Sequence, residues 1–124
     1  MRSTECFPPV PASVTAARRW VRGLLQANAP DGVARDAELC VSELAANAVR
    51  HARTEFEVEV SDDAGVVCVT VRDESPGPVR PRAAPAFDST GRGLTIVETL
   101  ARRWGVIEDP PSGKTVWFVL GDAG

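Results

Sequence analysis

The chain has 124 residues, of which 44% are hydrophobic and 25% charged, and its formal net charge is −3. This length and balance predict one globular domain and exclude a wholly disordered, collagen-like or fibrous chain. The negative charge argues against broad nucleic-acid binding by phosphate neutralisation, and no apolar run approaches the roughly 18 residues of a membrane span.

The first elements along the chain are an arm and two helices. Three prolines within residues 7–11 remove backbone donors, so this stretch is predicted to be an extended arm at an edge. Apolar residues recur with helical spacing over residues 13–28, where Ser13 is expected to cap the helix, and again over residues 33–52. The segment Pro30-Asp31-Gly32 separates the two helices.

Strands and one more helix follow. Hydrophobic residues alternate with glutamates over residues 55–60, which predicts a strand with one wet face. A turn at residues 62–65 leads into a more buried partner strand over residues 66–73. Residues 74–90 are rich in Pro and Gly and are predicted to form a long functional loop. The remaining predicted elements are a third helix after Gly93 and strands over residues 104–108 and 114–120.

This order of elements predicts an α+β fold. Hairpin spacing between the strands indicates a mainly antiparallel sheet, and helices with one apolar stripe each indicate a single covering layer. We therefore expect a two-layer α/β sandwich with three helices on one face of the sheet.

Cysteine usage and the N-terminal residues bear on the compartment. The three cysteines, Cys6, Cys40 and Cys68, are widely spaced and form no CxxC pair. This pattern argues against a disulfide framework or a zinc site and is typical of a reducing compartment. Met1 leads into no basic-then-apolar signal region. We expect a cytoplasmic protein without a membrane partner.

Four polar side chains share one face of the second helix. Glu43 and Asn47 lie one turn apart, and Arg50 and His51 lie on the next turn. A carboxylate and a carboxamide placed in this way can hold a hydrated Mg²⁺ ion. The alternative is a solvated helix face with no ligand.

A second candidate cluster lies where a buried strand meets the long loop. The carboxylate of Asp73 could accept a hydrogen bond from an exocyclic amine, and Ser75 and Gly77 would let a ring approach the backbone. An ordinary Asp-Ser-Pro-Gly turn is the alternative.

Two glycine-containing segments complete the set. Gly91-Arg92-Gly93-Leu94 could direct backbone N–H groups at a phosphate beside a helix N-terminus, although it matches neither a P-loop nor GxGxxG. Gly113-Lys114-Thr115 is not a P-loop either, because residue 108 is glutamate. Its alternative interpretation is a turn into a buried strand.

In chain order, these clusters resemble the nucleotide-binding boxes of the gyrase, heat-shock chaperone and histidine-kinase superfamily. Within it, the chain is most similar to small actinobacterial ATP-binding proteins of the anti-sigma factor serine/threonine kinase family. The resemblance spans about residues 7 to 120 of a single domain over residues 1–124. It is carried by Phe7-Pro8-Pro9, Val41-Ser42-Glu43-Leu44, Asn47-Ala48-Val49-Arg50-His51-Ala52, Asp73-x-Ser75-x-Gly77, Gly91-Arg92-Gly93-Leu94, Trp104-Gly105 and Gly113-Lys114-Thr115-Val116-Trp117-Phe118.

The resemblance implies the Bergerat ATP-binding fold, with ATP and Mg²⁺ as ligands. Glu43 would act as general base or orient the attacking hydroxyl, Asn47 would hold Mg²⁺, and Arg50 could touch the phosphates. Asp73 would accept the adenine amine. The remaining implied roles fall to Gly77 and Thr115 in the base pocket, to Gly91 and Gly93 as lid hinges and phosphate donors, to Arg92 and Leu94 beside them, and to residues 74–90 as the ATP lid.

The resemblance also implies a function. Such a kinase would phosphorylate a serine or threonine of a small anti-sigma factor antagonist, alternately bind a sigma factor, and so regulate transcription by partner switching. The alternative is a nucleotide-dependent binding module that sequesters a regulator without phosphoryl transfer. Two departures from the family pattern favour this alternative, namely Ala46 in place of a frequent Thr and Ser89-Thr90 in place of an arginine. A homodimer is compatible with the family, and the proline arm is a candidate contact.

Overall fold

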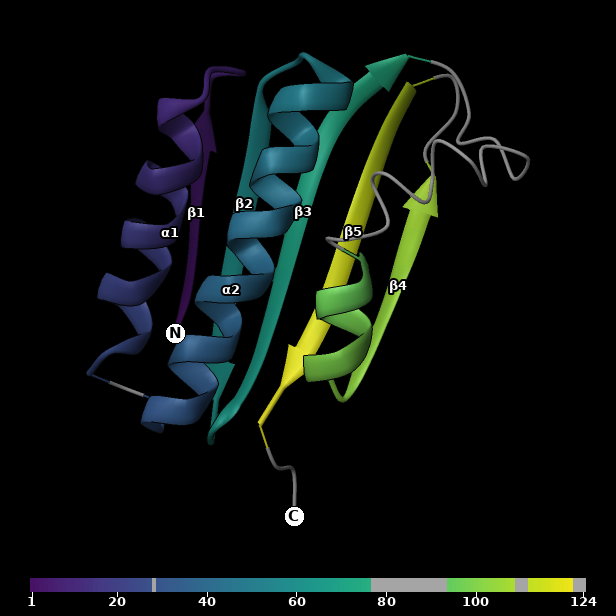
Figure 1. The fold of residues 1–124 in the computed structure, drawn as a ribbon. Coiled ribbons are helices and arrows are strands. Elements are labelled where there is room, and N and C mark those ends of the chain that lie inside the picture. Colours follow the sequence, from purple (N-terminus) through teal and green to yellow (C-terminus); the bar gives the residue numbers. More distant parts are fainter. Residues whose placement is uncertain (28, 77–93, 109–111, 122–124) are drawn as a thin grey trace.

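Five strands and three helices form two layers in the computed structural model, which describes residues 1–27, 29–76, 94–108 and 112–121 (Figure 1). All three helices lie on one face of the sheet, which confirms the predicted α+β sandwich. Residues 94–100 form the third helix. The other elements are β1 (Arg2–Phe7), α1 (Ala12–Leu25), α2 (Asp31–Asn47), the π-helical turn η1 (Ala48–Ala52), β2 (Phe56–Asp63), β3 (Val66–Pro76), β4 (Arg103–Glu108) and β5 (Ser112–Leu120).

The strands follow the order β1-β2-β3-β5-β4, and each neighbouring pair is antiparallel. Successive side chains of a strand point to opposite faces of the sheet, and directly paired residues point to the same face. Val69 of β3 pairs with Phe118 of β5, and both side chains are fully buried. The face that carries them is therefore the one that the helices cover.

The strand β1 was not predicted. Its register with β2 runs from Arg2 opposite Ser61 to Phe7 opposite Phe56. Phe7 is its only buried residue, and its ring stacks on that of Phe56 with 5.4 Å between centroids and meets the Trp20 ring edge-on at 6.1 Å. Burying one phenylalanine contributes about 1.5–3 kcal/mol, so this side chain anchors the edge strand.

Two local predictions are corrected. Ser13 does not cap the first helix, because α1 begins one residue earlier and has no side-chain cap. Its buried hydroxyl instead donates to the carbonyl of Pro8 at 2.7 Å and fixes the proline segment to the helix. The predicted loop over residues 74–90 also begins too early, because β3 continues to Pro76, which pairs with Ser112 after an irregularity in register.

The cysteines are all free. Cys40 is fully buried, and burial raises the pKa of its thiol to about 12. Cys68 is half-buried and Cys6 is exposed. None of the helices in the described ranges is both long and apolar enough to cross a membrane.

Candidate functional site

One end of the sandwich gathers the predicted polar residues that the structure describes. The C-terminal end of α2 with η1, the C-terminal end of β3 and the beginning of β5 all reach this end (Figure 1). The turn η1 contacts β3, and α2 contacts both β3 and β5. Three segments that are far apart in the sequence therefore meet at this end.

Glu43 and Asn47 lie one turn apart on α2 and are both half-buried. Their neighbours Leu44, Ala45 and Ala48 are buried, so the two polar side chains lie at the margin of the core. An amide oxygen beside a carboxylate is a donor set that suits Mg²⁺, which keeps several waters and takes few protein ligands. The described residues contain no group of three His, Cys, Asp or Glu side chains that could hold a metal by themselves.

A π-helical turn places the next two polar residues. The N–H of Arg53 donates to the carbonyl of Ala48 at 3.0 Å, and Arg53 has a φ of 57° that ends the helix in the left-handed region. Single π turns inside helices are frequent at functional sites, because they change the direction in which side chains leave the helix. Arg50 and His51 are exposed on this turn, although the protein covers part of the His51 imidazole.

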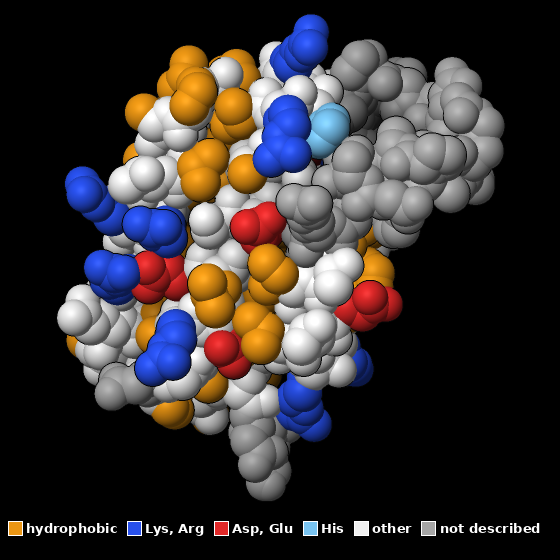
Figure 2. All heavy atoms as spheres, in the orientation of Figure 1, with side chains coloured by type: hydrophobic (Ala, Val, Ile, Leu, Met, Phe, Trp, Pro, Cys, Tyr) orange, Lys and Arg blue, Asp and Glu red, His pale blue; other side chains and the backbone are white. Residues whose placement is uncertain are grey.

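Basic side chains surround His51. Burial lowers the pKa of its imidazole, and the charges of Arg50, Lys114 and Arg53 lower it further. Figure 2 shows basic side chains next to this histidine, the only one in the chain. Arg50, Arg53 and Lys114 therefore form a local cluster of positive charge around His51, which favours an anionic ligand.

Asp73 lies on the helix-covered face of β3 and is only 3% exposed. Its register partner on β5 is Lys114, whose Nζ lies 3.7 Å from Oδ2 of Asp73. A carboxylate so deeply buried accepts hydrogen bonds from a limited number of donors. The role of Asp73 as an acceptor for a base amine stays a prediction.

Thr115 is not beside Asp73. It pairs with Arg72 on β3 and Ile107 on β4, so its side chain points to the face of the sheet opposite the helices. The interpretation of Thr115 as part of a base pocket beside Asp73 is therefore corrected, and Lys114 is the residue that lies opposite Asp73 in the register. The sequence alone indicates the face to which Lys114 points. Val116 and Phe118 are apolar and point to the helix-covered face, and Lys114 lies two residues before Val116, so it points to the same face.

Several predicted site residues lie outside the described residues, so their positions stay predictions. Leu94, in contrast, is half-buried in the third helix and packs against the core. Outside the described residues lie Gly77, Gly91, Arg92, Gly93, Ser89-Thr90 and the rest of the proposed lid from residue 77 to residue 90.

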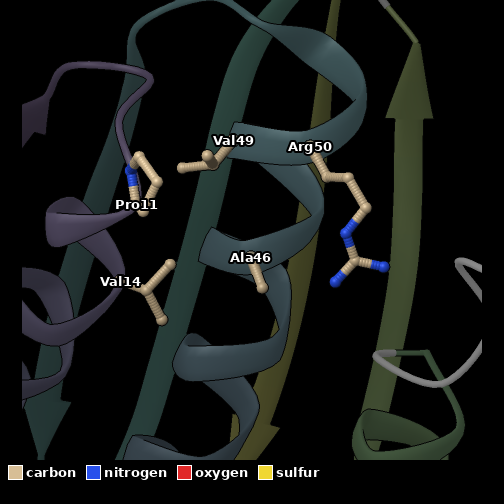
Figure 3. A pocket seen from close by; sticks show the side chains of 5 residues that line it. All are labelled: Pro11, Val14, Ala46, Val49 and Arg50. Atoms are coloured by element: carbon tan, nitrogen blue, oxygen red, sulfur yellow. The ribbon is translucent and has the colours of Figure 1, made fainter.

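A separate groove of about 310 Å³ lies between the beginning of α1 and the end of α2. Figure 3 shows Pro11 and Val14 facing Ala46 and Val49 across it, while the guanidinium of Arg50 extends away from Pro11 and Val14. Ala46 thus belongs to the groove, and the hydroxyl of the threonine that is frequent at this position would lie among apolar side chains.

Comparisons with known proteins agree with this geometry. The family model described as "Histidine kinase-like ATPase domain" matches residues 7–120. Among solved structures, the Acinetobacter baumannii histidine kinase AdeS matches with a TM-score of 0.57 at 14% sequence identity, over 98% of this chain and 68% of that one. This likeness shows the fold alone. No curated protein sequence matches the chain.

Proposed function

The chain belongs to the family of histidine kinase-like ATPase domains, and on this premise we propose that it binds ATP with Mg²⁺ and transfers the γ-phosphoryl group to a serine or threonine of a separate small protein. Because the chain resembles anti-sigma factor kinases, we propose that the phosphorylated protein is an anti-sigma factor antagonist and that a sigma factor is the alternate partner. Both would meet the chain in the cytoplasm. The partner switch would regulate transcription.

The buried carboxylate of Asp73 is the observation that supports this proposal most strongly. It is 3% exposed, and it lies at the same end of the sandwich as the α2 face that carries Asn47. The adenine amine would donate to Asp73, and Asn47 would hold the ion that neutralises the phosphates. Arg50 supplies a further positive charge for the phosphates at this end of α2.

In the proposed transfer step, one proton and one phosphoryl group move. Glu43 accepts the proton of the substrate hydroxyl as its oxygen forms a bond to the γ-phosphorus. The bond between the γ-phosphorus and the bridging oxygen breaks, and ADP leaves with that oxygen. Phosphoryl transfer depends mainly on positioning and charge neutralisation, so one base, one metal ligand and a few cations suffice.

A two-stage experiment tests the proposal. ATP binding is first measured by calorimetry with and without Mg²⁺. Label transfer from ATP carrying radioactive γ-phosphate to candidate antagonist proteins is then followed on gels. Mg²⁺-dependent binding with transfer to a serine or threonine supports the proposal, and the lack of ATP binding would refute it.

A second candidate is a nucleotide-dependent binding module that does not transfer phosphate. The groove between α1 and α2 favours it, because Ala46 and Val49 present an apolar surface and are adjacent in sequence to Asn47 and Arg50. A protein seated in the groove would contact the same helix end that binds the nucleotide. ATP binding without transfer to any partner would support this candidate.

A further inference from the structure

Lys114 is the only lysine in the chain, and the structure places it against the most buried acidic side chain of the described residues. Its Nζ lies 3.7 Å from Oδ2 of Asp73. The side chain of Asp73 is 4% exposed and that of Lys114 is 28% exposed. The ammonium thus lies at the rim of the site, with its charge directed at the carboxylate inside.

The strand register determines this position. Lys114 pairs with Asp73 on β3 and with Glu108 on β4, and all three residues lie on the helix-covered face. The charge of Lys114 also reaches His51 on η1. Lys114 on β5 therefore interacts electrostatically both with Asp73 and with the basic turn at the end of α2.

We infer that Lys114 and Asp73 together read the base of the bound nucleotide, and that this pair admits guanine as well as adenine. The inference rests on the proposed nucleotide-binding function. A carboxylate supplies only acceptors, and an ammonium supplies only donors. A site that contains both within 3.7 Å can satisfy a base edge on which a donor and an acceptor are adjacent.

Both purines present such an edge, in opposite order. Adenine has a donating 6-amine next to the accepting N1, so the amine would donate to Asp73 and Lys114 would donate to N1. Guanine has an accepting 6-oxo group next to the donating N1–H, so N1–H would donate to Asp73 and Lys114 would donate to the oxygen. Lysine carries a compact charge on a flexible stem, which lets the donor reach either position.

Without the ammonium, the site would discriminate against guanine. The 6-oxo group would then lie beside a buried carboxylate and would have lost the charged donor of Lys114. An acceptor left without a partner in a buried site, or one that loses a charged donor, lowers affinity by about tenfold or more. The affinity for adenine would fall less, because its 6-amine would still donate to Asp73.

Competition binding tests the inference. A fluorescent ATP analogue is titrated onto the full chain with Mg²⁺ and then displaced by unlabelled ATP or GTP. We expect GTP to displace the analogue at concentrations within about tenfold of those of ATP. In Lys114→Thr, the ratio of the dissociation constants of GTP and ATP should rise by about tenfold or more.

Two further variants make the result specific. Lys114→Arg retains a cationic donor and should retain GTP binding. Thr115→Ala changes the adjacent residue on the opposite face and should leave the ratio unchanged. Thermal melting of each variant establishes that it is folded.

The outcomes separate the inference from the proposed function. ATP binding with a hundredfold weaker GTP, or an unchanged ratio in Lys114→Thr, overturns the inference and leaves the proposed function intact. If the wild-type chain binds neither nucleotide, both fail.

Discussion

The indole of Trp117 lies across the backbone of Gly105, its register partner on the neighbouring edge strand. A Cβ at residue 105 would lie 2.7 Å from Nε1 of Trp117, closer than real Cβ contacts. Both residues lie on the sheet face opposite the helices, so Trp117 is not a core residue and packs against β4.

This contact predicts the effect of Gly105→Ala. The added methyl group must push the indole off β4 or separate the two strands, and overpacking of this kind lowers the free energy of unfolding by about 1–3 kcal/mol. Urea denaturation followed by tryptophan fluorescence measures the loss. In a chain that already carries Trp117→Val, Gly105→Ala should lower the free energy of unfolding by less. Equal losses with and without Trp117→Val would contradict the contact.

Asp73→Asn tests the acceptor of the site. The carboxamide has nearly the same size but replaces one accepting oxygen by a donor and removes the charge beside Lys114. We expect ATP affinity to fall by about tenfold or more, measured by calorimetry with Mg²⁺. Asp63→Asn is the matched control, because Asp63 is an exposed acid where β2 turns into β3, at the opposite end of the sandwich. Equal losses in both variants would show that the effect is not specific to the site.

The periodicity of the sequence predicts most of the fold, for a physical reason. The buried stripe of α2 and the alternation of Phe56, Val58 and Val60 in β2 both arise from one-sided burial, which leaves a pattern in the chain. β1 leaves almost none, because it is an edge strand whose single buried residue is Phe7. Its existence depends on pairing with residues more than 40 positions away.

In the candidate site, too, some features follow from local sequence patterns and others do not. Glu43, Asn47 and Asp73 can be found from helical spacing and from the end of a buried strand. The π turn at Ala48–Ala52 cannot, because its hydrogen bonding is not encoded by a local apolar pattern. The position of Lys114, and not Thr115, opposite Asp73 follows from the alternation of side chains along β5, but only once the register with β3 is known.

His51 predicts a pH dependence of stability. Burial and the charges of Arg50, Lys114 and Arg53 lower its pKa in the folded state below the usual value of about 6.5. The unfolded chain therefore binds a proton more readily, so this contribution to stability is fully present above pH 6.5 or so and is lost as the pH falls through the lower folded pKa. Urea denaturation between pH 5 and pH 8 should show a weaker acid dependence for His51→Gln than for the wild type.

The cause of that shift can be tested separately. The chain has a single histidine, so one imidazole resonance reports the pKa of His51 by NMR titration. Lys114→Thr removes one of the repelling charges and should raise this pKa, whereas Arg2→Thr, on the far edge strand β1, should not. No change in Lys114→Thr would contradict the proximity of β5 to η1.

Glu43→Gln separates the two candidate functions. Glutamine has nearly the same size but cannot accept the hydroxyl proton, and general-base catalysis contributes about 10²- to 10⁴-fold to rates. We expect the rate of label transfer to fall within that range while ATP affinity stays close to that of the wild type. Glu38→Gln is the control on the same helix, because Glu38 pairs with Arg18 and Arg22 of α1 rather than with the site. Unchanged transfer in Glu43→Gln would refute the assignment of the base. A wild-type chain that binds ATP but transfers no label would leave the binding module as the function of this fold.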